Sequence, residues 1–403
     1  MKDIIIIGGG ASGMMAAVKA KENNPDKSVL LVEKQNRIGR KLLSTGNGRC
    51  NLTNLNAEKS RYHGSFRKYM DTVLNRCSAN DVIGEFERMG LRVKAEGDGR
   101  VYPLSNHAAS VLDVLRFRLN KLGVEMLCDT AVKDIKKNKK GFSVITDKES
   151  LECKKLIIAT GSCASPKLGS DKSGLSILEK LGIKTVPFSP VLCPVKVKSD
   201  YIASLKGVRA SGSASLYDGY KLVKSEFGEI QFTEDSLSGI CVFNLSSTLN
   251  KTKKPEIRLD LMPDYSFNDT LNILISNKEI FNDRAVEDLL TGIFNKKLGL
   301  VLLKASGIKP LSREISSLTQ SELKRLTSVI KAFSFKPTMQ NDFGNAQAAS
   351  GGVIGTELDP QTMESLRIRG LYIIGECVDI DGDCGGFNLQ FAFASGIIAG
   401  ESV

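Results

Sequence analysis

The sequence has few of the residues that build metal clusters and dithiol centres. His63 and His107 are its only histidines, and no two of its nine cysteines are spaced as C-x-x-C. Zinc sites and dithiol redox centres depend on such residues at short spacings, so neither kind of centre is supported and no metal site is expected. We expect reduced thiols, most of them buried.

Long apolar runs and a secretory leader are lacking as well. No stretch approaches the roughly 18 apolar residues of a membrane span. The short apolar N-terminus runs directly into glycines, unlike a signal peptide. We therefore predict a cytoplasmic protein without a membrane segment. Its 403 residues, 41% of them hydrophobic, suggest two or three domains with a full core, and leave the oligomeric state open.

Acidic residues are outnumbered by basic ones, which gives a net charge of +11. Much of the excess is lysine in short clusters, such as residues 136–140 and 251–254. Clusters of this kind are typical of solvated turns, which is the simpler interpretation. The alternative is a basic surface that contacts RNA or an anionic substrate.

The most informative motif is a glycine-rich turn directly after an apolar run. Residues 4–7 are four isoleucines, which predict a buried parallel strand. Gly8, Gly10 and Gly13 follow with G-x-G-x-x-G spacing. This spacing is typical of a turn into a helix whose first N–H groups bind a pyrophosphate.

The next predicted strand ends in a carboxylate. Residues 29–32 are apolar, and Glu33 follows them about twenty residues after Gly13, as in dinucleotide-binding folds. A carboxylate there accepts hydrogen bonds from a ribose 2′-hydroxyl and repels a 2′-phosphate. FAD or NAD is therefore favoured over NADP.

A third stretch, residues 37–51, is too rich in glycine and cations for an ordinary helix. Backbone N–H groups and cations suit a loop around a polar ligand, where the cations would contact phosphates or a flavin carbonyl. An exposed basic loop is the alternative. The residues concerned are Gly39, Arg40, Lys41, Gly46, Gly48 and Arg49.

The segment between residues 78 and 161 is expected to continue the sheet and cover it. One helix follows Asn80-Asp81 and stops at Gly90, and a second starts at Ser110, with Asp113 three residues on, and stops at Gly123. Residues 96–99 predict a hairpin turn between them. Strands are predicted at 124–127, 131–135, 142–146, 151–154 and 156–161, the last of which places Thr160 and Gly161 at the carboxyl edge of the sheet.

From residue 190 the pattern changes to short strands and helices. Strands are predicted at 191–198, 214–216, 221–224 and 229–233, and several short helices at 269–327, with Thr319 and Glu322 as a capping box. The first pattern returns with a turn at 350–353 and a buried strand at 371–376. Gly385 and Gly386 then open a helix over 389–399, whose free N–H groups at residues 387–389 could stabilise negative charge on a reduced flavin.

Over nearly its whole length the chain resembles the BaiN/YhiN family of FAD-dependent oxidoreductases, which includes aminoacetone-oxidase-like flavoproteins. Residues 41–51 and 375–390 carry the most specific part of the resemblance, beside 8–13, 99–103, 228–233 and 350–353. The chain departs from the family pattern at Phe387, where Tyr is expected, and at Ser238-Gly239-Ile240, where Pro often follows the glycine. Neither change touches FAD, though either could alter the fit of the substrate.

The resemblance implies an α/β fold in which a glutathione-reductase-like, Rossmann-type FAD domain is interrupted by an inserted domain. We place the FAD domain at residues 1–189 and 336–403, a β-rich substrate domain at 190–265 with 328–335, and a helical subdomain at 266–327. The same resemblance implies that Arg40 and Lys41 lie near the pyrophosphate and Val132 near the adenine. The predicted FAD-binding residues are Gly8, Gly10, Ala11, Ser12, Gly13, Glu33, Lys34, Arg40, Lys41, Thr45, Gly46, Asn51, Val132, Thr160, Gly161, Gly375, Glu376, Gly386, Phe387, Asn388, Leu389 and Gln390.

Two substrate classes for C=C reduction follow from the resemblance: steroid enones of the bile-acid type, and uracil in ribosomal RNA, which would give dihydrouridine. A single dinucleotide fingerprint makes NAD(P)H a transient electron donor rather than a second bound cofactor. Arg49 or Arg100 would hold the carbonyl or a phosphate, and Tyr102 would donate the proton, with Cys50 as an alternative acid. An oxidase of small amines such as aminoacetone, and a flavoprotein that acts only on bound ribosomal RNA precursors, are the alternative functions.

Overall fold

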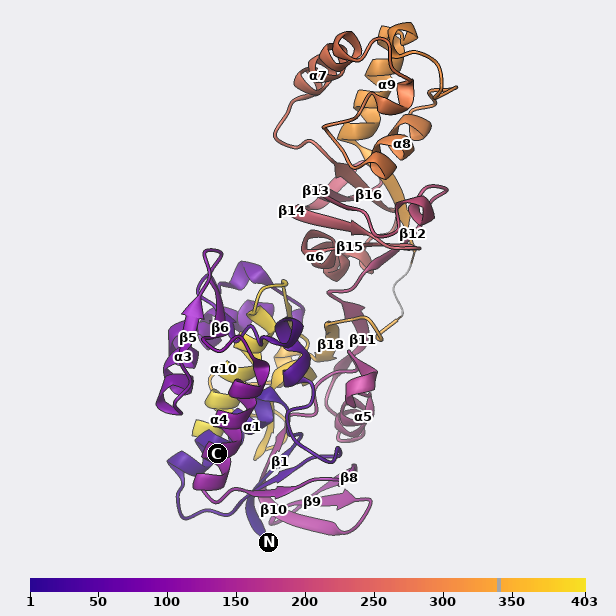
Figure 1. The fold of residues 1–403 in the computed structure, drawn as a ribbon. Coiled ribbons are helices and arrows are strands. Elements are labelled where there is room, and N and C mark those ends of the chain that lie inside the picture. Colours follow the sequence, from indigo (N-terminus) through magenta and orange to yellow (C-terminus); the bar gives the residue numbers. More distant parts are fainter. Residues whose placement is uncertain (339–341) are drawn as a thin grey trace. The chain divides into compact units, whose positions relative to one another are not determined.

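The computed structural model describes residues 1–338 and 342–403, which form two compact units (Figure 1). The first unit comprises Met1–Pro190 and Asp342–Val403, and the described residues between them form the second. Each unit has its own hydrophobic core. In the described part of the chain, no helix combines the length and the apolar character that a membrane crossing requires. The three-part division of the chain stays a prediction.

A seven-stranded sheet forms the centre of the first unit. Its strands are β1 (Lys2–Ile7), β2 (Val29–Val32), β7 (Glu125–Leu127), β8 (Val132–Asn138), β9 (Gly141–Thr146), β10 (Ser150–Ile158) and β19 (Leu371–Ile373). The order is β7-β2-β1-β10-β9-β8, and β19 pairs with β10. β7, β2, β1, β19 and the second half of β10 are parallel, as their buried apolar sequences predict.

β10 is one continuous strand where the sequence predicted two. Its first half pairs antiparallel with β9, and its second half pairs parallel with β1. Two lysines lie between the halves, and each charged side chain has a partner within the strand's surroundings. Lys154 pairs with Asp3 at 2.7 Å, and the Lys155 ammonium lies 5.8 Å from the ring centre of Tyr372, so the strand continues through both residues. One strand therefore belongs both to the meander and to the parallel sheet.

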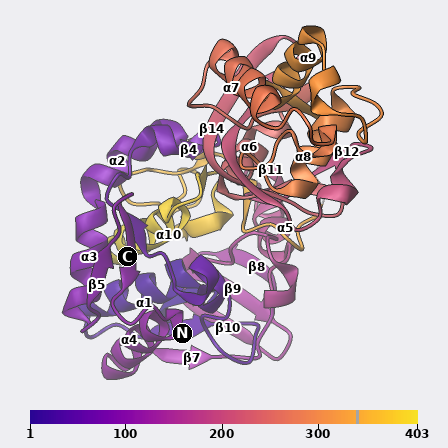
Figure 2. The same ribbon diagram turned by 45° about the horizontal axis from the view of Figure 1, so that its top comes forward.

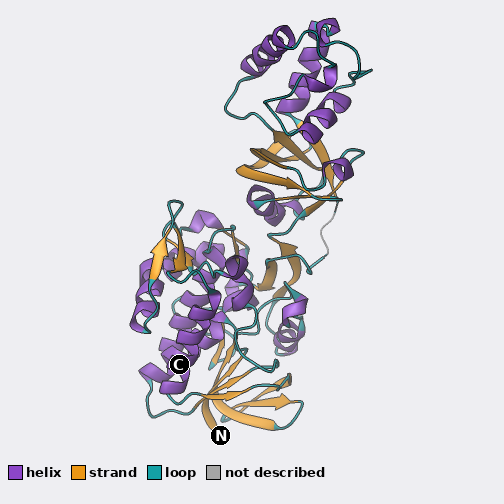
Figure 3. Cartoon of the chain, viewed as in Figure 1, coloured by secondary structure: helices purple, strands orange, loops and turns teal. Residues whose placement is uncertain are grey.

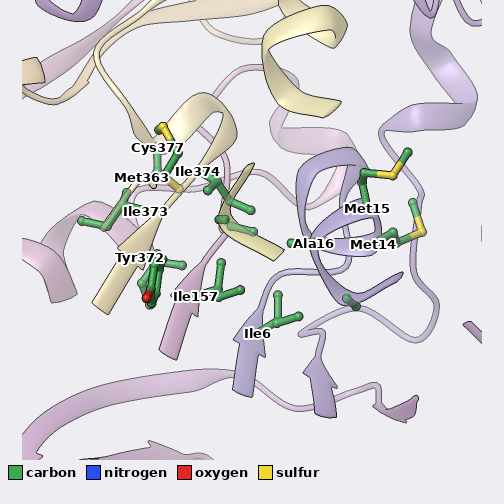
Figure 4. Close-up of a cluster of buried hydrophobic side chains, with 14 of the residues drawn as sticks. Ile6, Met14, Met15, Ala16, Ile157, Met363, Tyr372, Ile373, Ile374 and Cys377 are labelled. Atoms are coloured by element: carbon green, nitrogen blue, oxygen red, sulfur yellow. The ribbon is translucent and has the colours of Figure 1, made fainter. Parts of the chain in front are cut away.

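The core of the first unit lies between this sheet and helix α1 (Ala11–Asn23). Ile6, Ile157 and Ile373, on β1, β10 and β19, are fully buried together with Met14 and Met15 of α1 (Figure 4). Complete burial of such a side chain contributes about 1.5–3 kcal/mol. The apolar run that predicted a strand thus fixes where α1 begins, directly above the strand's carboxyl end.

The C-terminal helix α10 (Phe387–Ser402) packs along α1, and the two lie side by side in both ribbon views (Figures 1 and 2). The packing is close because small residues face each other. A Cβ at Gly396 would lie 2.5 Å from the Ser12 carbonyl oxygen, and one at Gly400 would lie 2.6 Å from that of Ala16. The first and last helices of the chain therefore form one layer.

The remaining elements of the first unit include two helices that begin earlier than predicted. α3 begins at Ala79 because Ser78 caps it and the Asp81 carboxylate bonds back to the Ser78 N–H. α4 begins at Ala108 without a side-chain cap, since the Ser110 hydroxyl pairs with Ser105 instead. The elements are α2 (Met70–Arg76), α3 (Ala79–Arg88), α4 (Ala108–Lys121), α5 (Ser173–Lys180), β3 (Thr53–Asn54), β4 (Tyr62–His63), β5 (Val93–Ala95), β6 (Arg100–Pro103), β11 (Thr185–Val191), β18 (Ala348–Val353) and β20 (Asp381–Gly382).

Residues 350–353 were predicted as a turn, which is wrong. They form the end of β18, which pairs with β11, and Gly351 and Gly352 have φ values of +92° and +117° there, which glycine adopts without strain. The predicted hairpin at residues 96–99 is confirmed, since β5 and β6 pair across it and the Gly99 N–H donates to the Glu96 carbonyl at 2.9 Å.

The second unit is a closed six-stranded barrel with helices packed on it (Figure 3). Its strands are β12 (Val195–Lys198), β13 (Arg209–Asp218), β14 (Lys221–Phe232), β15 (Ser236–Ser238), β16 (Pro255–Asp260) and β17 (Phe333–Pro337). Its helices are α6 (Ile240–Leu249), α7 (Phe267–Ile280), α8 (Lys296–Ala305) and α9 (Gln320–Lys331).

Several predictions for this unit need correction. The predicted strands 221–224 and 229–233 are parts of one strand, β14, which ends at Phe232, and the predicted strand 191–198 is divided between β11 and β12. Helix α6 and strand β16 were missed, because both depend on contacts with the β13–β14 hairpin rather than on a local pattern. The capping box at α9 is confirmed: the Thr319 hydroxyl accepts from the Glu322 N–H, and the Glu322 carboxylate accepts from the Thr319 N–H at 2.9 Å.

Candidate functional site

The carboxyl ends of β1 and β2 open onto a cavity of about 180 Å³. A second cavity of about 290 Å³ adjoins it, reaches β8, and shares Gly8, Glu33, Lys34 and Thr160 with the first. We refer to the two together as the elongated cavity. It lies at the edge of the parallel sheet where open α/β folds bind their ligands.

The elongated cavity brings together predicted residues from several distant segments. Four of these segments are the start of α1, the stretch after β2, the end of β10 and the start of α10, and β8 and the turn after β19 add one residue each. The predicted FAD-binding residues that line it are Gly8, Gly10, Ala11, Ser12, Glu33, Lys34, Arg40, Lys41, Thr45, Val132, Thr160, Gly161, Glu376, Asn388 and Leu389.

The start of α1 has the geometry of an anion site. Gly8 has a φ of +107°, and a Cβ on it would lie 2.3 Å from the Ala159 carbonyl oxygen, so only glycine fits the turn. No side chain caps α1, and a Cβ at Gly10 would meet no described atom within 4 Å. The first N–H groups of the helix therefore face open space in the cavity, which suits a pyrophosphate.

Glu33 is held in place by the backbone around it. Its carboxylate accepts from the Gly9 N–H at 2.7 Å and from the Gln35 N–H at 2.8 Å, one bond to each oxygen. Because each carboxylate oxygen has a further lone pair, the oriented carboxylate can still accept from hydroxyl groups. This is the donor–acceptor arrangement that a ribose requires.

An ion pair spans the first cavity. Lys41 Nζ lies 2.6 Å from Glu376 Oε2, and the Ser162 hydroxyl donates to the same oxygen at 3.3 Å. The family resemblance placed Lys41 near the pyrophosphate and Glu376 among the FAD-binding residues. It gave no signal that the two side chains meet, because 335 residues separate them.

Lys34 forms an ion pair with Asp171 beside the cavity. Its ammonium lies 2.5 Å from Asp171 Oδ2. Burial raises the pKa of Asp171, but the hydrogen bonds from Lys34 and Ser173 outweigh it and leave the pKa below its usual value. Asp171 therefore stays ionised near neutral pH, and Lys34 contributes to the cavity with its charge already paired.

Asn51 supplies an unsatisfied acceptor beside the start of α10. Its Oδ1 is buried and has no hydrogen-bond partner among the described residues. A Cβ on Gly386, the uncapped N-cap of α10, would lie 2.8 Å from this oxygen. Buried acceptors in folded proteins have donors, and a flavin with its ribityl chain carries N–H and hydroxyl donors. The open start of α1 and the oriented Glu33 carboxylate fit the ADP half of FAD, and this orphaned oxygen is an acceptor that needs a donor near the start of α10.

Some predicted FAD-binding residues do not line the elongated cavity: Gly13, Gly46, Asn51, Gly375, Gly386, Phe387 and Gln390. Gln390 is fully buried, and its amide accepts from the Thr53 hydroxyl at 2.5 Å and donates to the Cys77 carbonyl at 3.0 Å. Gly13 faces the Gly8 carbonyl, where it allows α1 to approach β1. Their contact with FAD stays a prediction.

The two candidate catalytic residues form a stacked pair. The Arg49 guanidinium lies 3.8 Å from the ring centre of Tyr102, which is buried. Neither residue lines the elongated cavity; the Tyr102 ring lies beside Gly46, where a Cβ would be 3.5 Å from it, and Gly46 follows Thr45 of the cavity wall. Burial raises the pKa of Tyr102, against the lowering effect of Arg100 and Arg49. Tyr102 is therefore a neutral phenol at physiological pH.

The cysteines near the site are protonated thiols. Burial raises the pKa of Cys50 to about 12 and that of Cys377 to about 11. Cys377 is fixed by contacts of 3.2 Å with the Thr160 hydroxyl and the Gly161 N–H. A thiolate is the reactive form of cysteine, so these residues pack rather than react.

Asp379 and Asp383, which precede α10, form hydrogen bonds that hold neighbouring loops in place. Asp379 accepts from the Ser65 N–H at 2.9 Å and from the Gly351 N–H at 3.0 Å. Asp383 lies 3.0 Å from His63 Nε2. These bonds connect the segment before α10 to residues around β4 and β18. They give Asp379 and Asp383 a structural role that the sequence alone did not reveal.

Sequence reasoning missed several residues of the cavity wall. Ser162 follows Thr160 and Gly161 directly in the sequence, and this position could have predicted that it lines the cavity. Gln35 belongs to the stretch after β2, and its side chain accepts a hydrogen bond from Arg40. Gly169, Ser170 and Gln347 come from segments without a motif, and only the folded chain brings them to the cavity.

Comparison with known families and proteins gives a consistent result. A family model described as the HI0933-like protein Rossmann domain matches residues 2–402. The 3-dehydro-bile acid delta(4,6)-reductase of Clostridium scindens is 36% identical over 406 residues, which cover 100% of this chain and 99% of the reductase. The ribosomal RNA dihydrouridine synthase of Haemophilus influenzae is 27% identical over 99% of this chain and 98% of its own.

A solved structure supports the same fold. The quinol fumarate reductase of Escherichia coli superposes with a TM-score of 0.51 at 13% identity, over 99% of this chain and 69% of the reductase chain. At this identity the likeness concerns the fold alone. Together with the family match, it confirms the predicted Rossmann-type α/β fold with an insertion.

Proposed function

Because the chain belongs to the HI0933-like family and is an FAD-dependent oxidoreductase, we propose that it reduces a carbon–carbon double bond conjugated to a carbonyl in a small molecule. The similarity to the bile-acid reductase, 36% over the whole chain, favours a steroid-type enone. The similarity to ribosomal RNA dihydrouridine synthases, 27% and 28%, makes uracil in RNA the second candidate. Both substrates contain a C=C bond activated by a carbonyl.

The observation that carries the proposal is the stacked Arg49–Tyr102 pair. Reduction of an enone needs a cation at the carbonyl oxygen, where negative charge develops, and a neutral acid that protonates the α-carbon. A guanidinium 3.8 Å from the ring of a neutral phenol supplies both groups at one place. Arg100, whose charge also acts to lower the pKa of Tyr102, is the alternative cation.

FAD, when bound and reduced, supplies the hydride for the β-carbon. The start of α1 and Glu33 would hold its ADP half, Lys41 would lie near the pyrophosphate, and Glu376 and Asn51 would hold the part nearer the flavin. The electron pair of the double bond then moves to the carbonyl oxygen, which Arg49 stabilises, and the Tyr102 proton goes to the α-carbon. We further propose NADH or NADPH as a transient donor, and the cytoplasm as the location.

The direct test is anaerobic reduction of the FAD-loaded protein by NADH and by NADPH, followed by reoxidation. We expect a steroid enone to reoxidise the flavin and to be converted into one equivalent of saturated ketone. Reoxidation by a ribosomal RNA fragment with formation of dihydrouridine, but not by enones, would favour the second candidate. Rapid reoxidation by oxygen with an amine as reductant would identify an amine oxidase and contradict the proposal.

Variants separate the two half-reactions. Tyr102→Phe should slow reoxidation by the enone about 100-fold or more, the usual range for loss of a general acid, and leave reduction by NAD(P)H unchanged. Asp71→Asn, which removes an exposed ion pair with Lys59 at 2.8 Å on another part of the unit, is the matched control. Equal slowing of both half-reactions by Tyr102→Phe would show a structural rather than an acid role.

A further inference from the structure

Two residues outside the predicted site hold the Arg49 guanidinium. Glu96, in the turn between β5 and β6, accepts from Arg49 Nη2 at 2.6 Å. Asn106, just before α4, accepts through Oδ1 from Nη2 at 2.9 Å and from Nε at 3.3 Å. The guanidinium is thus fixed from two separate segments, while its face rests on Tyr102.

This arrangement leaves one edge of Arg49 available. Nε and Nη2 are engaged by Glu96 and Asn106, and Nη1 has no hydrogen-bond partner among residues 1–338 and 342–403. The guanidinium is planar, so fixing Nε and Nη2 also fixes the direction in which Nη1 donates. A carbonyl or carboxylate oxygen is the ligand that suits such an edge.

The anchors themselves are held by the backbone. Asn106 has a φ of +56°, a conformation that Asn tolerates better than most residues, and its N–H donates to the Pro103 carbonyl at 2.9 Å. Glu96 lies at the start of the tight turn closed by the bond from the Gly99 N–H. Both anchors are therefore tied to β6, the strand that carries Tyr102, so that Arg49 and Tyr102 share one rigid support.

We propose that Glu96 and Asn106 are positioning residues, which set Arg49 on Tyr102 with Nη1 directed to the carbonyl oxygen of the substrate. This inference rests on the proposed function, because it names how the same site recognises its substrate. The Arg49–Glu96 pair is about one-third exposed on each side, and exposed pairs contribute little to stability. A role in fold stability alone therefore does not account for three hydrogen bonds to one side chain.

The test is a double-mutant cycle of Glu96→Gln and Arg49→Met in the FAD-loaded protein. The measured quantity is the rate constant of flavin reoxidation by whichever acceptor reoxidises the wild type. We expect about a 10-fold loss for Glu96→Gln, a larger loss for Arg49→Met, and no further loss when Glu96→Gln is added to Arg49→Met, because Glu96 acts through Arg49. Reduction by NAD(P)H, FAD content and thermal unfolding should stay at wild-type values in Glu96→Gln, as in Asp71→Asn.

A second readout needs no turnover. In 15N-arginine-labelled protein, the side-chain signals of Arg49, identified by their loss in Arg49→Met, should be those of a guanidinium with restricted rotation. They should become those of a freely rotating group in Asn106→Ala and in Glu96→Gln. Additive losses in the cycle, or an Arg49 signal unchanged by both substitutions, would overturn the inference. Failure of the wild type to reduce enones would contradict the proposed function alone, since both measurements remain informative with another acceptor.

Discussion

Two glycines of the same fingerprint should fail in different ways when changed to alanine. A Cβ at Gly13 would lie 1.9 Å from the Gly8 carbonyl oxygen, whereas a Cβ at Gly10 would meet no described atom within 4 Å. Gly10 also has φ and ψ values of −80° and −169°, which alanine can adopt. We therefore predict that Gly13→Ala damages the fold, and that Gly10→Ala damages only the binding of FAD.

The magnitudes follow from these contacts. Gly10→Ala should leave the free energy of unfolding of the apoprotein within about 1 kcal/mol of the wild type, since alanine adds no clash and restricts the unfolded chain. The methyl group would occupy the place of a phosphate oxygen and cost two hydrogen bonds to a charged group, about 3–6 kcal/mol, or more than about 100-fold in affinity. Gly13→Ala must push α1 away from β1, and such overpacking costs about 1–3 kcal/mol or more.

The assay has two parts for each variant. Urea unfolding of the apoprotein, followed by far-UV circular dichroism, gives the stability, and quenching of FAD fluorescence gives the affinity. Wild-type FAD affinity in Gly10→Ala would show that the pyrophosphate does not lie at the start of α1. Wild-type stability of the Gly13→Ala apoprotein would refute the steric argument for the third glycine.

Three further outcomes follow from packing and charge. Gly396→Ala places a Cβ 2.5 Å from the Ser12 carbonyl and should lower the free energy of unfolding by about 1–3 kcal/mol, whereas Gly84→Ala, whose Cβ has room in α3, should raise it by up to about 1 kcal/mol in the same urea titration. Burial raises the pKa of the Cys50 thiol to about 12. The stability that this shift contributes is full below the unfolded pKa near 8.5 and is lost as pH rises toward 12, so the free energy of unfolding in urea should fall between pH 8 and pH 10 by about 1–2 kcal/mol for each such thiol, and by less in Cys50→Ala. Glu85→Gln removes the carboxylate that lies 3.0 Å from the nearly buried Lys19 ammonium, and it should lower the free energy of unfolding by about 2 kcal/mol in thermal unfolding. A loss below about 0.5 kcal/mol would show that the other partners of Lys19 suffice.

Local patterns predicted the parts of the fold that local physics determines. The four isoleucines of β1 are buried, as a run of apolar residues predicts for a central strand, and the glycines after them are those of a turn into a helix. Residues 4–13 alone therefore predicted the strand, the turn and the start of the helix. The capping box of α9 is equally local, because Thr319 and Glu322 satisfy each other's backbone N–H groups. The Rossmann-type fold was predictable for this reason.

Contacts between distant segments were not predictable in this way. The closure of the barrel depends on β16 pairing with β13 and β17, and no residue in 255–260 signals those partners. The Lys41–Glu376 pair and the Glu96 and Asn106 anchors of Arg49 likewise arise from tertiary packing. The sequence therefore predicted candidate site residues such as Arg49 and Lys41, but not the hydrogen-bond partners that orient their side chains.

The cavity wall also explains why both ends of the chain are needed in one site. The first N–H groups of α1 come from the N-terminus, whereas Glu376, Asn388 and Leu389 come from the last thirty or so residues, and the Gly396 and Ser12 contact brings the two helices together. The Lys41–Glu376 ion pair joins the stretch after β2 to the segment that leads into α10. In the proposed placement, with the pyrophosphate at α1 and the flavin at α10, both parts of FAD depend on the same packing of α1 on α10, so FAD affinity should report on the completed fold of the first unit as well as on its individual contacts.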